Sequence, residues 1–271
     1  MDIMVLGNIP QGAGLSSSAS FSVAFATAIN HVGNMGLSAT EIALLCQAAE
    51  NEFVGCKCGI MDQLISAAGK RQHALLIDCR SLDYKAINLP VEAAILIIDS
   101  KVSRGLVDSE YNTRRNQCEE AAGILQVESL REANMDDLLA SESLMSGASF
   151  RRARHVVSEN ERTMAAADAL SEGNYESLSK LMSASHASMR DDFEITTPEI
   201  DFLVEIVGQI LGKEGGVRMT GGGFGGCIVA LAPKSYSKKI IDAVTEFYPQ
   251  KTGLTPEIHL FTASDGAGQV Q

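Results

Sequence analysis

The first part of the chain carries apolar residues three or four positions apart. This spacing predicts helices over residues 21–29, from residue 38 onward, and over residues 60–68. Ser38 and Glu41 have the spacing of a capping box, which closes the start of a helix. The stripe expected to face the core from that helix is Ile42, Leu45, Cys46, Ala49 and Phe53. Residues 55–59, with glycine at both ends, are expected to end the helix.

Short apolar runs without helical spacing predict strands. They cover residues 74–77, 93–98, 227–231 and 257–263, and Val5-Leu6 is a shorter run typical of a strand or turn. Further helices are predicted at 108–127, 150–172, 174–190, 198–212 and 235–248. Thr197 is the expected N-cap of the fourth of these, with Pro198 at its first position. Because helices and strands do not alternate regularly, the pattern favours an α+β fold over a doubly wound sheet.

Length and charge narrow the class of protein. A chain of 271 residues can bury a large core and is expected to form two lobes. Its net charge of −12 opposes nonspecific binding to nucleic acid or to an acidic membrane. The six cysteines show no disulfide framework or zinc spacing, and neither a secretory signal nor a membrane-spanning stretch is evident, so a cytoplasmic location is expected. The pattern does not determine an oligomeric state.

Residues 10–20, Pro-Gln-Gly-Ala-Gly-Leu-Ser-Ser-Ser-Ala-Ser, have the pattern of a phosphate-binding loop. Gly12 and Gly14 permit close approach of backbone amides to an anion, and a helix beginning near Ser16 adds unpaired N–H groups and a positive dipole end. Serine hydroxyls can donate to phosphate or coordinate a hard cation. The alternative is a loop with a serine N-cap, but the whole pattern favours phosphate. It is neither a Walker loop nor a dinucleotide-binding fingerprint.

Two acids are candidates for chemistry. Asp62 lies in an apolar, glycine-containing segment, Cys58–Gln63, where a carboxylate suits a general base or a metal ligand. An N-cap of the following helix explains Asp62 equally well. Glu50 lies close to the apolar stripe of its helix and is a candidate for a cavity, although a solvated helix position is the commoner explanation.

A second glycine-rich stretch, residues 215–226, precedes a predicted strand. Its glycines exceed what a tight turn needs and favour close backbone approach to a ligand. Tyr111–Arg115 places a phenol, an amide and two guanidiniums on one helix, and by itself is typical of a solvated face. Arg151–His155 is likewise expected at the surface.

Together these segments resemble the galactokinases, a family in the small-molecule kinase superfamily that also holds homoserine, mevalonate and phosphomevalonate kinases. Residues 10–19 are similar to the superfamily's ATP motif, and residues 218–227 to its C-terminal glycine motif. Residues 58–63, 109–115 and 185–193 are more particular to galactokinases. The resemblance extends over the whole chain, with several motifs in order.

The resemblance implies a two-lobed α+β kinase fold that binds ATP and galactose and transfers the γ-phosphoryl of ATP to the anomeric C1 hydroxyl. The implied ATP-phosphate loop is Gly12, Ala13, Gly14, Leu15, Ser16, Ser17 and Ser18. Ser18 and Glu50 would ligate Mg²⁺, Asp62 would be the catalytic base and contact the sugar, and Tyr111 would contact the sugar. The glycine motif near the active site is Gly221, Gly222 and Gly223.

The chain departs from the family at its beginning. It has no counterpart of the N-terminal signature that contains Gly-Glu-His-Thr-Asp-Tyr. In galactokinases that part of the chain supplies sugar-binding acids and an arginine that holds the catalytic aspartate ionised. The expectation is therefore an incomplete N-terminal ATP-binding lobe over residues 1–90, a C-terminal lobe over 91–271, and little activity for this chain. The alternatives are an inactive fragment, a ligand-sensing homologue, or a kinase for a related sugar such as N-acetylgalactosamine.

Overall fold

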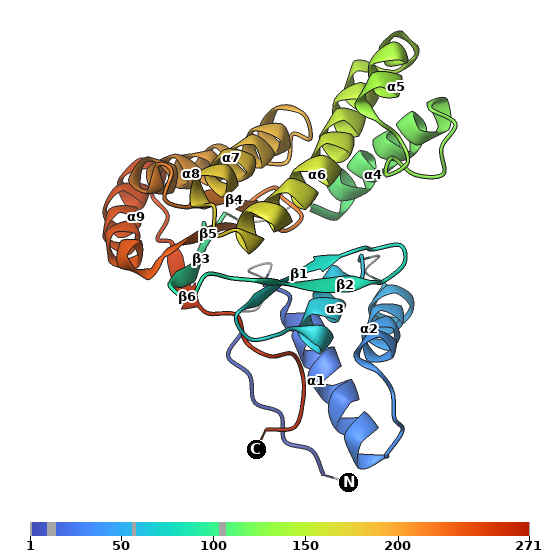
Figure 1. Ribbon diagram of the computed structural model, residues 1–271, viewed down its shortest axis with the longest axis vertical. Coiled ribbons are helices and arrows are strands. Elements are labelled where there is room, and N and C mark those ends of the chain that lie inside the picture. The colour runs from blue at the N-terminus through green and yellow to red at the C-terminus, as the bar shows by residue number, and fades with distance from the viewer. Residues whose placement is uncertain (1, 10–14, 56–57, 103–106, 271) are drawn as a thin grey trace. The chain divides into compact units, whose positions relative to one another are not determined.

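The computed structural model describes residues 2–9, 15–55, 58–102 and 107–270. The chain divides into two compact units, shown with their helices and strands in Figure 1. The first consists of Met1–Val91 and Thr262–Gln271, and the second of Glu92–Phe261. These units differ from the predicted ranges, 1–90 and 91–271, because the last ten residues return to the first unit.

Three helices form the first unit's core: α1 (Ser17–Val32), α2 (Ala39–Ala48) and α3 (Met61–Ala68). An antiparallel hairpin follows them, made of β1 (His73–Ile77) and β2 (Tyr84–Asn88). The buried core residues are Val23, Ile42, Ala43, Cys46, Ile60, Leu64 and Ala67. The predicted capping box is confirmed at the start of α2, where Ser38 N–H donates to the Glu41 carboxylate at 2.7 Å and Ser38 Oγ accepts from Glu41 N–H at 3.3 Å.

The predicted apolar stripe on α2 is only partly correct. Ile42 and Cys46 are buried, whereas Leu45 is 56% exposed and Phe53 is 92% exposed. Ala49 is also exposed, so the core-facing side of α2 consists of Ile42, Ala43 and Cys46. The regular α-helix ends at Ala48 and continues as a π-helical segment, η1 (Ala49–Val54). A π-turn spans one more residue than an α-turn, so the α-helical spacing no longer holds there.

An antiparallel sheet organises the second unit, with strand order β4-β5-β3-β6. The strands are β3 (Ala93–Asp99), β4 (Gly216–Thr220), β5 (Cys227–Pro233) and β6 (Glu257–Phe261). Alternate residues of the paired central strands share one face: Leu96 lies opposite Ala230, and Ile98 opposite Ile228. That face is buried with residues of α8 (Pro198–Leu211) and α9 (Ser237–Thr252), as expected for a half-covered antiparallel sheet.

The remaining helices of this unit are α4 (Val107–Ile124), α5 (Met135–Ala140), α6 (Gly147–Ser171) and α7 (Tyr175–Asp191). Two short 3₁₀ segments, η2 (Glu142–Leu144) and η3 (Lys234–Tyr236), complete the described elements. Helices α4 and α6 run side by side, and α5 lies at their far end (Figure 1). Their common core contains Ala121, Ala122, Leu130, Leu138, Phe150, Ala153 and Val157.

The predicted longer helices and apolar strands are present, with small shifts at their ends. Thr197 caps α8 as predicted, its Oγ1 accepting from Ile200 N–H at 3.4 Å. The pattern missed α5, β2 and β4. Strand β4 lies inside the glycine-rich stretch and forms by pairing with β5, a contact that no local pattern reports. Val5-Leu6, predicted as a strand or turn, is neither, because residues 2–8 have no regular secondary structure.

Candidate functional site

The start of α1 supplies the described part of the predicted phosphate loop. Gly12, Ala13 and Gly14 lie outside the described residues. Ser16 is in the left-handed region at φ 57° and ψ 35°, a conformation that costs a residue other than glycine about 1–3 kcal/mol. No side chain caps the first turn of α1 in the described chain, and the exposed Ser18 lies in this turn. The first-turn amides therefore remain available to an anion.

Glu50 lies on the π-helical segment η1. Its side chain is partly buried and has no hydrogen-bond or ion-pair partner among the described residues. The backbone carbonyl of Glu50 accepts from Gly55 N–H, and Gly55, at φ 85°, ends the segment. π-Helical turns inside helices occur frequently at functional sites. The described structure leaves this carboxylate available to a ligand.

Two side chains hold the segment that leads to Asp62. Gln47 Nε2 donates to the Cys58 carbonyl at 3.2 Å, and Cys58 N–H donates to Asn51 Oδ1 at 2.8 Å. Gln47 and Asn51 lie on α2 and η1, so these bonds tie the approach to α3 to the helical stretch that bears Glu50. The sequence pattern did not identify either residue. The only sequence signal for a role of Gln47 and Asn51 was that both are polar and lie beside the apolar stripe of their helix.

Asp62 is the second residue of α3 and is partly buried. The N-cap of α3 is Ile60, without a side-chain hydrogen bond, so the alternative that Asp62 caps this helix is wrong. The Asp62 carboxylate makes no hydrogen bond or ion pair to any part of the chain that the structure describes. Helices α1, α2 and α3 pack on one another in the first unit. Ser18 lies on α1, Glu50 on η1 at the end of α2, and Asp62 on α3.

The other predicted residues belong to the second unit. Tyr111 lies near the beginning of α4; its side chain is outside the described part of the structure. Gly221, Gly222 and Gly223 lie in the loop between β4 and β5. Gly223 has φ +88°, and an added Cβ would lie 2.6 Å from Ile195 Cβ. Close packing against the protein's own chain thus explains this glycine, whereas Gly222 faces open space.

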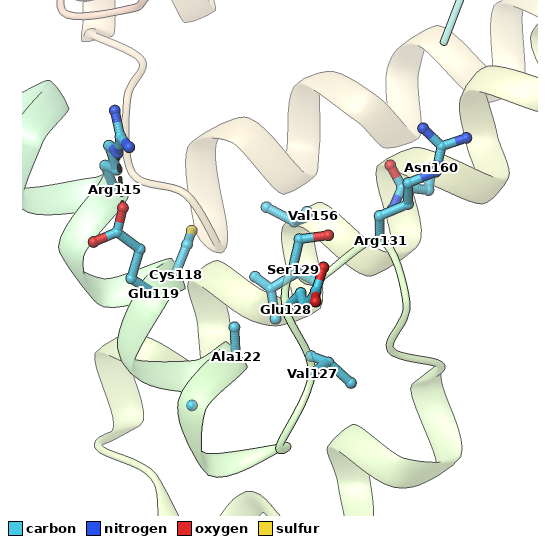
Figure 2. A pocket seen from close by; sticks show the side chains of 12 residues that line it. Arg115, Cys118, Glu119, Ala122, Val127, Glu128, Ser129, Arg131, Val156 and Asn160 are labelled. Atoms are coloured by element: carbon cyan, nitrogen blue, oxygen red, sulfur yellow. Dashed lines mark hydrogen bonds and ion pairs between the residues drawn. The ribbon is translucent and has the colours of Figure 1, made fainter. Parts of the chain in front are cut away.

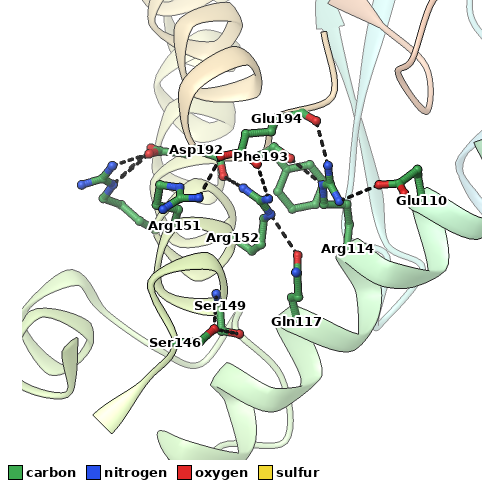
Figure 3. A network of polar contacts seen from close by, with 11 residues as sticks. Glu110, Arg114, Gln117, Ser146, Ser149, Arg151, Arg152, Asp192, Phe193 and Glu194 are labelled. Atoms are coloured by element: carbon green, nitrogen blue, oxygen red, sulfur yellow. Dashed lines mark hydrogen bonds and ion pairs between the residues drawn. The ribbon is translucent and has the colours of Figure 1, made fainter. Parts of the chain in front are cut away.

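A polar network missed by the sequence pattern lies beside this loop (Figure 3). Arg114 and Arg152 are 8% and 2% exposed, and His155 is 8% exposed. The expectation that Arg151–His155 lies at the surface is therefore wrong for Arg152 and His155, which are buried. Arg114 lies about two helical turns before the buried Ala121 on α4 and therefore on the same face of the helix. That spacing was the signal in the sequence that Arg114 is buried. The network's partners come from α4, α6 and residues 192–194.

A cavity of about 580 Å³ opens between α4, α6 and residues 127–131, and its lining contains none of the predicted site residues (Figure 2). Its floor includes Cys118 and Ala122, and an ion pair of 2.8 Å joins Arg115 and Glu119 at its rim. Burial raises the pKa of the Cys118 thiol to about 11, which makes it a poor nucleophile. Cys118 is therefore not a candidate nucleophile in this cavity.

The described residues contain no cluster of three or more histidine, cysteine, aspartate or glutamate side chains that could hold a metal ion. Within the same ranges, every helix is too short or too polar to cross a membrane.

Comparisons with known proteins agree with this architecture. Residues 1–70 match the GHMP kinases N terminal domain, and residues 166–250 match the GHMP kinases C terminal domain. The crystal structure of Lactococcus lactis galactokinase complexed with galactose superposes with a TM-score of 0.91 at 32% identity. This match covers 97% of the present chain and 69% of the galactokinase chain.

More distant solved structures share the fold. L. major mevalonate kinase in complex with R-mevalonate has a TM-score of 0.63 at 17% identity, over 93% of this chain and 67% of that one. Homoserine kinase from Cytophaga hutchinsonii has a TM-score of 0.59 at 14% identity, over 96% and 69%. The predicted α+β small-molecule kinase fold is thereby confirmed. Since the two matched domains cover more than half of the chain, and the galactokinase is 32% identical over nearly all of it, this protein belongs to the GHMP kinase family.

Proposed function

We propose that the protein transfers the γ-phosphoryl group of ATP to the C1 hydroxyl of galactose. The observation that supports this substrate is the similarity, over 97% of the chain, to a galactokinase crystallised with galactose. The mevalonate and homoserine kinases are similar at 17% and 14% identity, a level that supports the fold alone. The galactokinase-like segments 58–63, 109–115 and 185–193 favour the same substrate.

Asp62 is the proposed base. Its carboxylate has no partner within the described residues, and its place in the first turn of α3 is held through Cys58. In the proposed step the C1 hydroxyl of galactose gives its proton to the Asp62 carboxylate, and the hydroxyl oxygen forms a bond to the γ-phosphorus of ATP. The bond from that phosphorus to the β–γ bridging oxygen breaks, and ADP leaves with the electron pair.

The loop from Gly12 to Ser18 is the proposed phosphate cradle. The uncapped first turn of α1 and the left-handed Ser16 support this role in the described part of the loop. Amide N–H groups there would hold the phosphates in line with the attacking oxygen and stabilise the charge that develops on them. In the second unit, Tyr111 is proposed to contact the sugar, and Gly221–Gly223 is proposed to lie near the reacting groups.

Mg²⁺ fits the donors that the first unit offers. Ser18 presents an exposed hydroxyl, and Glu50 presents a carboxylate without a described partner. Both are hard oxygen ligands, and Mg²⁺ at a nucleotide site takes only one or two protein ligands beside phosphate oxygens and water. When bound with ATP, Mg²⁺ offsets negative charge on the phosphates. Ser18 and Glu50 are the residues proposed to hold it.

A coupled assay of ADP formation tests the substrate. We expect the rate of ADP formation to be low, in line with the little activity predicted for this chain, and to depend on galactose and Mg²⁺. Phosphorus NMR of the product should identify galactose 1-phosphate. Faster turnover with N-acetylgalactosamine would assign a related sugar instead. Binding of ATP and galactose without any turnover would contradict the proposed reaction and favour a ligand-sensing homologue.

The variant Asp62→Asn tests the proposed base. Loss of a general base costs about 10²- to 10⁴-fold in rate, so kcat should fall by that factor while the affinity for ATP remains within about twofold. The control is Glu52→Gln, the same carboxylate-to-amide change at an exposed position of η1. Isothermal titration with a nonhydrolysable ATP analogue checks binding. Retention of kcat within about tenfold of the unmodified protein excludes Asp62 as the base.

A further inference from the structure

Arginine side chains of α4 and α6 donate to backbone carbonyls of residues 192–194, in the segment 192–195 between α7 and α8. The first two residues of this segment belong to the galactokinase-like stretch 185–193, for which the proposed reaction supplies no role. The Asp192 carbonyl accepts from Arg152, the Phe193 carbonyl accepts from Arg114 at 2.8 Å, and the Glu194 carbonyl accepts from Arg114 at 2.9 Å (Figure 3). Three successive carbonyls are thus bound by buried guanidiniums.

Arg114 joins this segment to two others. It is 8% exposed, and Nη1 forms an ion pair of 3.0 Å with Glu110, one turn earlier on α4. The Arg114 guanidinium lies over the ring of Phe224, 5.4 Å from its centroid. Phe224 belongs to the glycine loop between β4 and β5, and its N–H donates to the Ile195 carbonyl at 2.7 Å. One side chain therefore contacts α4, the 192–195 segment and the glycine loop.

Arg152 fixes the same segment from α6. Its Nη2 pairs with the Glu194 carboxylate at 2.6 Å, and its Nε donates to Gln117 Oε1 at 3.0 Å. Gln117 lies on α4, one turn beyond Arg114, so the two arginines close a ring through α4, α6 and residues 192–194 (Figure 3). A planar guanidinium with several donors in fixed directions suits such a junction, and a lysine cannot make all of these bonds at once.

We infer that Arg114 is a positioning residue that sets the first turns of α4 against the glycine loop. Tyr111, the proposed sugar contact, lies three residues earlier on α4 and hence one turn away. This inference rests on the proposed function for the identity of the substrate. Arg114 itself has no role in bond making, since its donors are bound to protein groups.

The arrangement predicts a specific kinetic effect. Without the guanidinium, the Phe193 and Glu194 carbonyls lose their partner and α4 loses its contact with Phe224. The sugar-contacting turn would then shift, and a misplacement on the ångström scale can cost about 10²-fold in rate. The described residues of the predicted ATP loop, Leu15 to Ser18, belong to the first unit and take no part in this network. The KM for galactose should therefore change far more than the KM for ATP.

The experiment compares Arg114→Met and Arg114→Lys with Arg115→Met in the full chain. Arg115 is the neighbouring arginine on α4; it is exposed and pairs with Glu119. We expect both Arg114 variants to raise the KM for galactose by about tenfold or more, with the KM for ATP within about threefold and Arg115→Met close to the unmodified protein. Equal increases in both KM values, or no increase beyond that of Arg115→Met, would overturn the inference. If Arg114→Met does not fold, the KM values of Arg114→Lys for galactose and ATP provide the same test.

A second readout separates this inference from the proposed function. If the unmodified protein shows no galactose-dependent turnover, the proposed function fails, and amide hydrogen exchange decides the positioning role alone. Faster exchange in residues 107–113 and 220–227 of Arg114→Lys, with no change in Arg115→Met, supports the inference. Unchanged exchange in these two segments contradicts it.

Discussion

His155 is a buried histidine whose surroundings oppose its protonation. Burial lowers its pKa to about 4, and the positive charges of Arg162, Arg218 and Arg152 act in the same direction, against the opposing charge of Asp192. Its ring stacks on Phe193 with centroids 4.5 Å apart, and Nδ1 lies 2.9 Å from Ser188 Oγ. A neutral ring on α6 thus packs against the segment that Arg114 and Arg152 bind.

This shift makes stability depend on pH. The ordinary histidine pKa is 6.5, and in the folded protein it is about 4. Between these values the unfolded chain binds a proton that the folded protein does not, so the stabilisation is complete above pH 6.5 and is lost as the pH falls toward 4. The linked change in the free energy of unfolding is about 3 kcal/mol.

Urea unfolding at a series of pH values measures this effect in the unmodified protein and in His155→Gln. The variant should lose the histidine contribution to the pH dependence between pH 4 and 6.5, although it is less stable overall. The contribution of carboxylates with lowered pKa values, such as Asp191 and Glu194, should remain. His31→Gln provides the control, because His31 is exposed on α1. An unchanged pH dependence in His155→Gln would show that His155 is not its source.

The sequence correctly predicted the contacts of single residues where the interacting groups are close together in the chain. The Ser38–Glu41 capping box needs only groups three residues apart, and it was predicted and is present. The burial of Arg152 and His155 was not predicted, because their partners at Asp192 and Ser188 lie 40 and 33 residues away. The roles of Asp62 and Glu50 rest on resemblance and stay predictions.

At the scale of elements, the glycine loop between β4 and β5 has a shape imposed by its neighbours. Gly221, Gly223, Gly225 and Gly226 all have positive φ. An added Cβ on Gly225 would lie 2.8 Å from the Val102 carbonyl oxygen, and one on Gly223 would meet Ile195. The glycine-rich stretch was predicted to approach a ligand, and packing on the protein's own backbone accounts for part of its composition.

Adjacent glycines of this loop should respond differently to alanine. Gly223→Ala combines a positive φ with an overpacked Cβ and should lower the free energy of unfolding by about 2–4 kcal/mol. Gly222→Ala meets nothing within 4 Å and should change it by less than about 0.5 kcal/mol. Urea denaturation of the two variants gives the comparison. Similar losses in both would contradict a packing role specific to Gly223.

At the scale of the whole molecule, the chain crosses between its two units twice. After β6 it returns to the first unit, where Gln72 N–H donates to the Ala263 carbonyl at 3.2 Å and Gly266 N–H donates to the Gly69 carbonyl at 2.8 Å. Arg71 also pairs with Asp265 at 3.3 Å, an exposed contact of little energetic weight. The first unit therefore depends on residues nearly 200 positions away in sequence.

Gly266→Ala tests this dependence. A Cβ at Gly266 would lie 2.6 Å from the Ala67 carbonyl oxygen and 2.7 Å from Gly69 N, both backbone atoms, and we expect destabilisation of the first unit by about 1–3 kcal/mol. Hydrogen exchange in α3 should accelerate while exchange in α8 stays unchanged. Gly268→Ala is the matched control, since its nearest neighbour is 4.0 Å away. Equal acceleration in α3 and α8 would argue against separate units.

The sequence by itself determined the α+β class, most helices and apolar strands, the capping box and the kinase family, because these follow from local spacing and contiguous motifs. The tertiary structure decided the return of residues 262–270 to the first unit and the pairing of β4 with β5. It also decided which polar residues are buried, Arg114, Arg152 and His155 among them. Burial and strand pairing arise from contacts between segments distant in sequence, and only the folded chain brings these together.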